Sequence, residues 1–583
     1  MLHTLTRSLR ENKGPALVTV LLSALEVVFE IVIPLFMSNL IDFGIEGGSM
    51  AAVWKFGAFL LLLAAFQLAT GVLAARIAAR ASVGFAANLR EDMYNNVQTF
   101  AFSNIDKFST ASIVTRLTTD TTNVQNAFQM LMRMAIRSPV MLIFSMIVSF
   151  RISRDISMTF LVILPILALA LFFIIRSVFP VFSRVFRTYD ELNNVVQENV
   201  RGIRVVKSFN QERHEIGKFG AISERIYKDF SKGERLITLN APLMQFCIYT
   251  CMIVISWLGA KAIIASGNDP ALGLTTGNLT ALITYTMQIL SSLMMLSMVF
   301  AMLTISLSSA RRIAEVLEEQ TDIPQPEQPV MIVRDGAVDF DHVSFVYASK
   351  ADKKVLDDID LHIRSGETIG IIGGTGASKS SLVQLIPRLY DVTGGKLTLG
   401  GVDVRDYDLD TLRGAVAMVL QKNELFSGTI AENLRWGNEN ATDEELRHAC
   451  KLACADGFIS AMPDGYDTHI EQGGTNVSGG QKQRLCIARA LLKKPKMLIL
   501  DDSTSAVDTR TDAQIQQALS TYIPDTTKII IAQRISSVQN ADRIVVLDDG
   551  HIDAVGSHDA LLRTCDIYRE VYESQQKGGE DDA

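Results

Sequence analysis

The feature of this sequence that most constrains its fold is the crowding of apolar residues into its first half. A membrane-spanning helix needs about 20 mostly apolar residues. The runs that meet this condition are Pro15–Phe43, Val53–Ala75, Met130–Phe150, Ile156–Phe179, Asn240–Ser266 and Leu279–Ser309. The third contains Arg133 and Arg137, which a helix projecting beyond the bilayer would explain. The sequence therefore predicts a membrane α-helical domain with six spans in residues 1–320.

The distribution of Lys and Arg predicts the orientation of these spans. The two long links, between spans two and three and between spans four and five, are rich in Lys and Arg. The remaining links, near Glu46, Arg151 and Asp269, are short and poor in positive charge. Because positive residues favour the cytoplasmic side, we expect the long links and both termini to lie in the cytoplasm.

Both long links have helix-forming composition and helical spacing of apolar residues, and neither contains proline in its helical stretch. We expect helices that run well past the membrane and then turn back. The turns are predicted at Ser109–Leu117 and Gly202–Phe209, where each would present a short segment to a domain below. A solvated linker is the alternative.

Glu26 and Glu30 interrupt the first span and share one helix face, since they are four residues apart. An ionisable side chain inside a bilayer is costly and suggests a function. The two carboxylates either face a central cavity and attract cationic substrates, or they bond Gln67, Gln245 or another polar group and fix helix packing. The sequence leaves both interpretations open.

Composition excludes some classes of function and marks the domain boundaries. The net charge of −8 carries little information about partners. The sequence has no basic block with interleaved aromatic residues, so we expect no nucleic-acid partner. The six cysteines are few for this length, and we expect buried small hydrophobic residues rather than a metal site. A proline-rich linker, residues 321–330, precedes a second domain over residues 331–575, and residues 576–583 are expected to form a disordered tail.

The stretch "GGTGASKSS", Gly373 to Ser381, closely matches a phosphate-binding loop. It follows an apolar strand pattern and precedes a helical one, which is the context that such a loop requires. Its backbone N–H groups would cradle phosphate oxygens, while Lys379 would reach the outer phosphates and Ser380 would ligate Mg²⁺. Ser378 stands where the pattern has glycine, and a left-handed backbone there would cost serine about 1 kcal/mol.

Further motifs follow in the order that a nucleotide-binding domain requires. "KMLILDDSTSAVD" is an apolar strand that ends in Asp501, which can hold Mg²⁺. "NVSGGQKQR", residues 476–484, precedes a helix, and its Ser and Gly N–H groups would bind a phosphate at that helix's N-terminus. Gln421 follows another strand and opens a helix-rich insertion that extends to about Thr468.

These motifs resemble the ATP-binding cassette (ABC) transporters, and specifically bacterial exporter half-transporters, over essentially the whole chain. The resemblance rests on the phosphate loop, the Gln421 loop, the Walker B strand, the "SAVD" D-loop (Ser505–Asp508) and the "VSGGQKQR" signature, which is highly specific for that family. The resemblance implies a type I ABC exporter, in which six transmembrane helices with long cytoplasmic extensions are fused to an α/β P-loop domain. Two such cassettes enclose two ATP molecules head to tail, and intracellular arms couple their closure to the membrane domain.

The resemblance also implies which residues contact nucleotide and metal. Each ATP would lie between the phosphate loop of one subunit and the signature of the other. Mg²⁺ would be held by Ser380, Gln421 and Asp501. The ATP-contacting residues would be Tyr347, which stacks on adenine, Gly373, Gly374, Thr375, Gly376, Ala377, Ser378, Lys379, Ser380, Ser381, Val477, Ser478, Gly479, Gly480, Gln481 and Asp508. A structural role is the alternative for Tyr347.

Three positions depart from the family pattern. Asp502 follows the Walker B aspartate, where the family has the glutamate that polarises the attacking water, and Gln533 replaces the switch histidine. Together with Gln421, these are the positions expected to act in hydrolysis. Aspartate is one methylene shorter than glutamate, and a misplacement of about 1 Å can cost about 10²-fold in rate. Glutamine cannot carry the positive charge of histidine. With Ser378 as the third departure, we expect a site that binds ATP and hydrolyses it slowly.

The signature, which serves the other subunit's ATP, is intact. The sequence therefore predicts the degenerate-site subunit of a heterodimeric, multidrug-type exporter in a bacterial cytoplasmic (inner) membrane. The partner would be a second half-transporter, and the substrate an amphipathic drug, lipid or peptide. Two alternatives stay open, a homodimeric exporter in which Asp502 is a weak base and an ATP-gated regulatory membrane protein.

Overall fold

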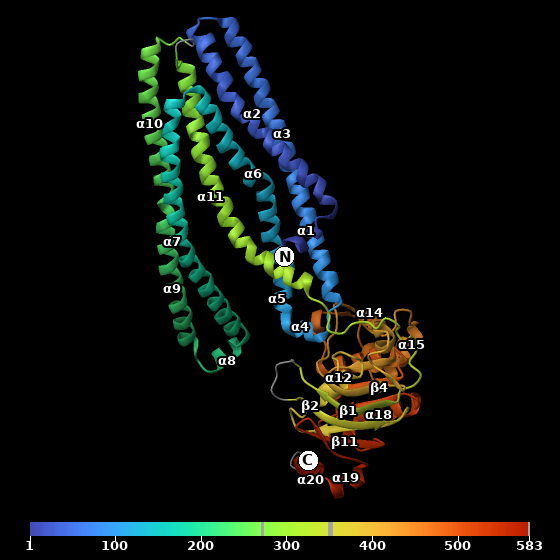
Figure 1. Cartoon of the computed structure of the whole chain (residues 1–583). Helices are drawn as coiled ribbons and strands as arrows, with labels where there is room; N and C mark the ends of the chain where they lie inside the picture. Colours follow the sequence, from blue (N-terminus) through green and yellow to red (C-terminus); the bar gives the residue numbers. More distant parts are fainter. Residues whose placement is uncertain (270–272, 348–353, 581–583) are drawn as a thin grey trace. The chain divides into compact units, whose positions relative to one another are not determined.

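The computed structural model describes residues 1–269, 273–347 and 354–580 (Figure 1). The chain forms two compact units. The first comprises Met1–Gln98 and Thr110–Glu319, and the second comprises Thr99–Ser109 and the chain from Gln320 onward. The boundary between Glu319 and Gln320 falls where the sequence changes from apolar runs to the proline-rich linker.

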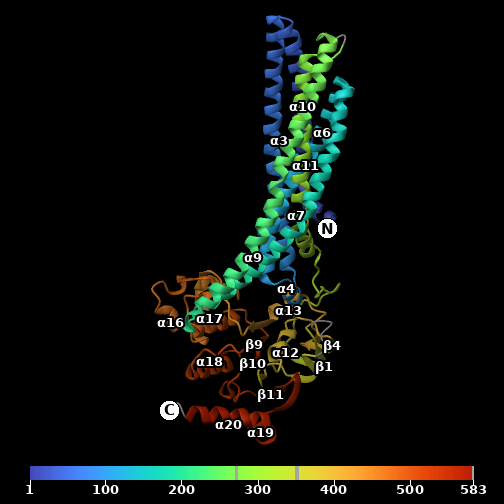
Figure 2. The same cartoon turned by 90° about the vertical axis from the view of Figure 1, so that its left-hand side faces the viewer.

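The first unit consists of long helices (Figures 1 and 2). Within the described residues, six helical segments are long and apolar enough to cross a membrane, which confirms the six predicted spans. The helices of this unit are α1 (Leu2–Arg7), α2 (Lys13–Asn39), α3 (Met50–Gln98), α5 (Thr110–Thr115), α6 (Thr121–Ile152), α7 (Arg154–Arg201), α8 (Ile203–Ser208), α9 (Glu212–Thr238), α10 (Asn240–Ser266) and α11 (Thr276–Glu318). Short helical turns η1 (Arg10–Asn12), η2 (Leu40–Glu46) and η3 (Arg116–Asp120) complete it.

Several of these helices are much longer than a bilayer requires. Helix α3 has 49 residues and α7 has 48. At 1.5 Å per residue each is about 70 Å long, whereas the hydrocarbon core is about 30 Å thick. The expected projection of helices beyond the membrane is therefore present, and on α6 Arg137 is paired with Glu26 and Glu30 of α2.

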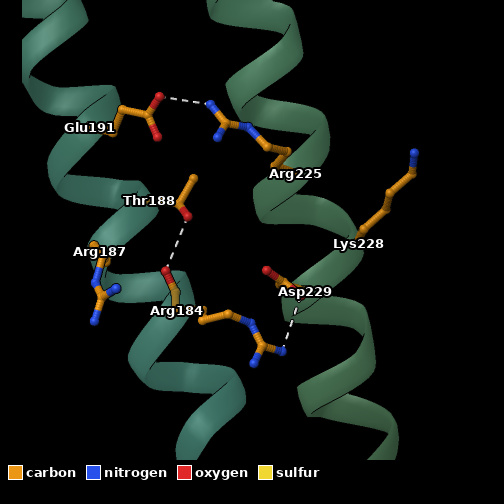
Figure 3. Close-up of a pocket in the computed structure, with 7 residues that line it drawn as sticks. All are labelled: Arg184, Arg187, Thr188, Glu191, Arg225, Lys228 and Asp229. Carbon is orange, nitrogen blue, oxygen red and sulfur yellow. Dashed lines mark hydrogen bonds and ion pairs between the residues drawn. The ribbon is translucent and has the colours of Figure 1, made fainter.

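Helices α7 and α9 pack side by side as an antiparallel arm. Leu192 and Val195 of α7 contact Ile222 and Ile226 of α9. Ion pairs bridge the two helices at Arg184–Asp229 (3.6 Å) and Arg225–Glu191 (2.8 Å), beside a polar hollow of about 480 Å³ (Figure 3). Because these pairs are exposed, the apolar contacts supply most of the stability of the arm.

The two predicted turns have different outcomes. The second, Gly202–Phe209, is the short helix α8. The first prediction, Ser109–Leu117, is wrong in position, because that stretch continues as α5 and η3 toward α6. The segment that packs on the second unit is instead helix α4 (Phe102–Phe108). A local helical pattern could not reveal the anchor, which is a contact between residues far apart in sequence.

Tyr390 anchors α4. Its hydroxyl donates a 2.9 Å hydrogen bond to Oδ2 of Asp106, and its ring meets the ring of Phe102 edge-on, with 5.8 Å between centroids. A hydrogen bond to a charged group contributes about 1.5–3 kcal/mol, so this contact holds the short helix to the compact unit.

We expect Tyr390→Phe to loosen α4, because it removes the bond to Asp106 and keeps the ring contact with Phe102. A loss of about 1.4 kcal/mol corresponds to tenfold faster local opening. Hydrogen–deuterium exchange of residues 99–109 measures this change. Tyr522→Phe, at an exposed tyrosine of the same unit, is the control and should leave that exchange unchanged. Equal exchange in both variants would contradict the anchoring role.

The second unit is built on two main sheets. An antiparallel sheet has the order β2-β1-β4-β5, and a six-stranded sheet has the order β12-β11-β3-β10-β9-β6. In the latter, β12 pairs antiparallel and the other strands are parallel. The strands of the first sheet are β1 (Val338–Phe345), β2 (Leu356–Ile363), β4 (Gly394–Leu399) and β5 (Val402–Asp403). The strands of the second are β3 (Thr368–Gly373), β6 (Val416–Val419), β9 (Met497–Asp501), β10 (Thr527–Ile531), β11 (Arg543–Asp548) and β12 (His551–Gly556).

Helices cover the parallel sheet and form the expected insertion after Gln421. Strands β9 and β10 are buried at every position, as continuous apolar runs predict for strands covered on both faces. The helices are α12 (Lys379–Leu385), α13 (Leu409–Ala415), α14 (Ile430–Arg435), α15 (Asp443–Leu452), α16 (Asp456–Ser460), α17 (Gly479–Leu492), α18 (Thr509–Tyr522), α19 (His558–Thr564) and α20 (Asp566–Glu580). A short ribbon, β7 (Gly428–Thr429) and β8 (His469–Ile470), joins the ends of the insertion.

The C-terminal tail differs from its prediction. Helix α20 continues to Glu580, so residues 576–580 of the expected disordered tail are helical, while residues 581–583 lie outside the described part of the chain.

Candidate functional site

Four neighbouring parallel strands end at one edge of the six-stranded sheet, and each leads to a predicted site residue. The strands β3, β10, β9 and β6 pair in that order. The loop Gly373–Ser381 follows β3, Gln533 follows β10, Asp502 follows β9, and Gln421 follows β6. Since parallel strands place their carboxyl ends at the same edge, the fold brings these separate motifs together.

The phosphate loop owes its shape to close packing and special backbone angles. A Cβ atom at Gly373 would lie 2.2 Å from the carbonyl oxygen of Leu547, so only glycine fits at the end of β3. Gly376 has a φ of 87°, which a side chain disfavours. Gly374, Thr375, Gly376 and Ala377 form the turn, and Lys379, Ser380 and Ser381 open α12.

Ser378 occupies the left-handed region, with φ of 67° and ψ of 21°. This is the conformation for which the usual glycine is suited, and serine can adopt it at a cost of about 1–2 kcal/mol. The substitution therefore strains the loop and leaves its path intact, as the sequence predicts.

Lys379 is held over the loop that precedes it. Its ammonium donates hydrogen bonds to the carbonyl oxygens of Gly373 (2.7 Å) and Gly374 (2.8 Å). Burial lowers the pKa of Lys379, and the carboxylates of Asp501 and Asp502 oppose that shift. These contacts place a positive charge at the edge of the sheet where the phosphate-loop residues gather.

Asp501 and Ser380 form a pair of oxygen ligands suited to Mg²⁺. Asp501 ends β9 and is 2% exposed. Burial raises its pKa, while a hydrogen bond from Ser380 opposes the shift. Among the residues described, no group of three or more His, Cys, Asp or Glu could hold a metal. Mg²⁺ typically takes one or two protein ligands together with substrate phosphates, so this smaller set fits the ion.

Asp502 is fixed by its backbone and by two amides. Its φ is 47°, and its N–H donates to the carbonyl of Ile531 on β10 at 3.0 Å. The Gln533 amide donates to Oδ2 of Asp502 at 2.8 Å, and Gln421 also bonds the carboxylate. Burial raises the pKa of Asp502, and these bonds act against the rise. All three predicted catalytic positions thus meet at one carboxylate.

Tyr347 lies beside the phosphate loop. Its hydroxyl is 2.7 Å from the Ser381 hydroxyl, and the residue is 44% exposed. Edge-on contacts join it to Phe345 (4.8 Å between centroids) and Tyr390 (5.1 Å). The exposed ring can still stack on a flat ligand, so the predicted adenine contact stays a prediction. No sequence motif marks Tyr390, which makes both this ring contact and the hydrogen bond that anchors α4.

The signature segment Val477–Gln481 begins α17. Ser478 accepts from the N–H of Gln481 at 3.3 Å, and Gln481 accepts from the N–H of Ser478 at 2.9 Å, which completes a capping box. A Cβ at Gly480 would lie 2.8 Å from the carbonyl of Ala506, whereas Gly479 has more room. Within the described residues, no hydrogen bond joins this segment to the phosphate loop of the same chain.

Gln483, which sequence reasoning did not single out, ties the signature helix to the loop after β9. Its amide nitrogen donates to the Asp502 carbonyl (3.4 Å) and the Ser505 hydroxyl (3.2 Å), and its oxygen accepts from the N–H of Ala506 (3.0 Å). The residue is 5% exposed. It lies within the "VSGGQKQR" motif, but only the fold places it against the D-loop.

Asp508 has a structural role in this chain. It caps α18 by accepting from the N–H of Thr511 at 2.9 Å, and that bond holds the pKa of Asp508 below its usual range. The predicted nucleotide contact of Asp508 is therefore not needed to explain a carboxylate at this position.

The fold and the site together define a membrane-embedded, nucleotide-binding protein whose cassette carries a phosphate loop, a buried Walker B carboxylate and a capped signature helix. Two family models match the chain, "ABC transporter transmembrane region" over residues 16–294 and "ABC transporter" over residues 356–505. YfiB of Bacillus subtilis (strain 168), an uncharacterised ABC transporter ATP-binding protein, is 35% identical over 558 residues, covering 96% of each chain. Rv1273c of Mycobacterium tuberculosis (strain ATCC 25618 / H37Rv), described likewise, is 33% identical over 580 residues, covering 99% of this chain and 98% of its own.

The chain belongs to the ABC transporter family. A bacterial Atm1-family ABC exporter solved with ATP bound aligns with a TM-score of 0.82 at 24% identity, covering 97% of this chain and 99% of that one. The likeness gives this chain the type I ABC exporter fold, with an N-terminal domain of six apolar helices fused to a C-terminal nucleotide-binding domain. The chain is thus an ABC transporter chain and a membrane protein with the fold that the sequence predicts.

We expect Ser378→Gly to stabilise the protein by up to about 1 kcal/mol, because it removes the left-handed strain but adds some unfolded-state entropy. For a domain of this size that corresponds to a melting temperature about 2–4 °C higher. ATP affinity should change less than twofold, since the loop has the same path in either variant. Ser378→Ala keeps the Cβ atom and should give no gain. Equal stabilisation by both substitutions would show that strain is not the cause.

Gln483→Leu should lower the melting temperature by about 4–8 °C. The substitution keeps the side-chain size and removes the hydrogen bonds of the buried Gln483 amide to Asp502, Ser505 and Ala506, each of which contributes about 0.5–1.5 kcal/mol. Thermal unfolding of the purified full-length protein measures the change. Gln517→Leu, on the exposed face of α18, is the control and should shift the melting temperature by less than 2 °C. Similar melting temperatures for the two variants would rule out the proposed tie.

Proposed function

We propose that this chain is one subunit of a heterodimeric ABC exporter that couples ATP binding and hydrolysis to the movement of amphipathic substrates. In this arrangement the chain binds ATP at a slow site of its own and supplies an intact signature to the ATP site of its partner. A bacterial cytoplasmic membrane is the proposed location, which agrees with the bacterial source of the relatives. Drug, lipid and peptide substrates are all compatible with the apolar spans.

The observation that carries the proposal is the hydrogen bond between Gln533 and Asp502, at 2.8 Å. These are the positions of the family's switch histidine and catalytic glutamate. The Asp502 carboxylate is one methylene short of the place that a glutamate would reach, and two amides hold it there. Neither amide can supply the positive charge that a histidine would bring to a developing phosphate charge. The shorter carboxylate and the missing histidine charge both slow ATP hydrolysis.

Nucleotide binding depends on other residues, which keep the geometry that it needs. Lys379 lies over the phosphate loop, and Ser380 bonds the buried Asp501. When bound, Mg²⁺ neutralises charge on the phosphates, and Ser380, Asp501 and the amide oxygen of Gln421 would hold it. These side chains therefore favour a site that binds ATP and hydrolyses it slowly.

The signature supports a role toward a partner. Ser478 and Gln481 form the capping box of α17 and use their own N–H groups in it, so the N–H groups of Gly479 and Gly480 are the ones that would meet a partner's phosphate. A chain with a complete signature and an incomplete hydrolytic pair is best completed by a different subunit that carries the glutamate and the histidine. The catalytic site of the exporter would then be shared between the two chains.

One observation favours a second candidate, a homodimeric exporter. Burial raises the pKa of Asp502, and a carboxylate whose pKa lies nearer to neutrality is a better general base. If Asp502 reaches the attacking water after a small backbone movement, two copies of this chain would suffice.

The decisive experiment restores the two family residues. We expect the double variant Asp502→Glu/Gln533→His, assembled only with itself, to hydrolyse ATP at least about 100-fold faster than the unchanged chain. Phosphate release from the purified chain in lipid nanodiscs is the measurement. Adding Lys379→Ala to the double variant should abolish the gain, which assigns it to the nucleotide site.

Two outcomes would overturn the heterodimer. One is brisk hydrolysis by the unchanged chain alone that Asp502→Asn abolishes, which favours the homodimeric exporter. The other is purification of the chain from its native membrane with copies of itself only. ATP-dependent movement of a dye or lipid in vesicles that hold the complete dimer would separate an exporter from an ATP-gated regulatory protein.

A further inference from the structure

The loop between β10 and the short helical turn η6 (Ile535–Ser537) carries Gln533, whose side chain bonds the Asp502 carboxylate at 2.8 Å. We refer to residues 532–535 as the switch loop. The hydrogen bond to Asp502 forms only when the backbone of this loop holds Gln533 within reach. The contacts that fix this backbone therefore bear directly on the hydrolytic pair.

The two ends of the switch loop are attached to neighbouring elements, but its middle has no support from other backbone groups. The N–H of Ala532 donates to a carbonyl of β3 at 3.3 Å, and the hydroxyl of Ser537 donates to the buried Asp512 of α18 at 2.5 Å. Within the described residues, no backbone group bonds the carbonyl of Gln533 or the N–H of Ile535. Support for these two groups must come from a side chain or from water.

Gln575 of α20 bonds both of these groups. Its amide nitrogen donates to the carbonyl of Gln533 at 2.7 Å, and its amide oxygen accepts from the N–H of Ile535 at 2.9 Å. The two bonds engage the peptide groups on either side of Arg534. A glutamine amide can form both at once, because it carries donor and acceptor on the same end of the side chain. We refer to this pair of bonds as the Gln575 clamp.

The core of the second unit holds α20 in place for this contact. Tyr568 is 0% exposed, and its hydroxyl lies 2.8 Å from Nδ1 of His558 on α19. Val571 and Tyr572 also pack against the core. Because Gln575 follows Tyr568 by seven residues, which is about two helical turns, the two side chains share one face of α20. The buried tyrosine therefore directs Gln575 toward the switch loop.

We propose that Gln575 is a positioning residue for ATP hydrolysis, through which α20 sets the place of the switch loop. The inference rests on the proposed function, since it concerns the same hydrolytic pair. Gln575 bonds only the backbone of the loop, so it acts on Asp502 through the side chain at position 533. Without the clamp the middle of the loop samples more positions, and fewer of them are productive. ATP binding depends on the phosphate loop and is not affected.

Gln575→Leu tests the clamp, since it keeps the size of the side chain and removes both hydrogen bonds. The matched control is Gln576→Leu, at the neighbouring glutamine, whose amide donates to Tyr572 of the same helix at 3.1 Å. Hydrogen–deuterium exchange of residues 532–538 in the full-length protein, without nucleotide, is the measurement. We expect Gln575→Leu to make exchange of the Ile535 N–H about fivefold faster, as the loss of one hydrogen bond implies, and Gln576→Leu to leave it unchanged.

ATP turnover separates positioning from a merely structural role. Gln575→Leu is introduced into whichever chain hydrolyses ATP faster, the unchanged one or Asp502→Glu/Gln533→His. We expect kcat to fall about fivefold while KM for ATP changes less than about twofold. The melting temperature should shift by less than about 2 °C, because Gln575 is exposed. In the same chain with alanine substituted at position 533, Gln575→Leu should lower kcat by less than about twofold, since the clamp then has no side chain to position.

Equal exchange of the Ile535 N–H in Gln575→Leu and Gln576→Leu would overturn the clamp. Faster exchange with an unchanged kcat would overturn the positioning role, and so would an equal loss of kcat when position 533 is alanine. The exchange measurement needs no nucleotide, so it does not depend on the proposed function. Brisk hydrolysis by the unchanged chain would count against the slow site and leave the clamp intact.

Discussion

The nucleotide site depends on the constraint that parallel strands end at the same edge of a sheet. The strands β3, β10, β9 and β6 are neighbours, although the residues that follow them, Ser378, Gln533, Asp502 and Gln421, are separated by up to about 150 positions in the chain. Each element is an ordinary apolar strand that could form elsewhere. Their adjacency brings a lysine, two carboxylates and two amides together and allows the amides to bond Asp502.

Sequence patterns predicted the features that depend only on neighbouring residues, namely the membrane spans and the backbone strain at Ser378. The six spans follow from hydropathy, because a bilayer demands about 20 apolar residues whatever their neighbours. The strain at Ser378 follows from the glycine that the loop needs, and its φ of 67° agrees. Contacts between distant segments gave no local signal. Tyr390 holds α4, Gln483 bonds the D-loop, and Arg137 pairs with α2, and each partner could be identified only from the fold.

The membrane half shows how such a contact changes an interpretation. The sequence leaves two interpretations of Glu26 and Glu30 open, carboxylates that attract cationic substrates or residues that bond Gln67, Gln245 or another polar group and fix helix packing. Their polar partner is an arginine, Arg137 of α6, which bonds both carboxylates and joins α2 to α6. These ion pairs favour the packing interpretation, because a carboxylate inside a bilayer is costly unless it is paired.

In the cassette, the backbone of the loop that carries Asp502 and the side chain of Asp502 have different roles. Gln483 bonds the Asp502 carbonyl, the Ser505 hydroxyl and the Ala506 N–H, so the signature helix depends on the backbone of the loop that carries Asp502. The Asp502 carboxylate itself bonds Gln533 and does not contact the signature. A subunit that serves its partner's ATP needs the backbone contacts that position the signature helix. It does not need an efficient hydrolytic carboxylate at position 502. Under the proposed heterodimer, a shortened acid with a preserved backbone path is therefore the change that slows this chain's own site while leaving the signature that it offers intact.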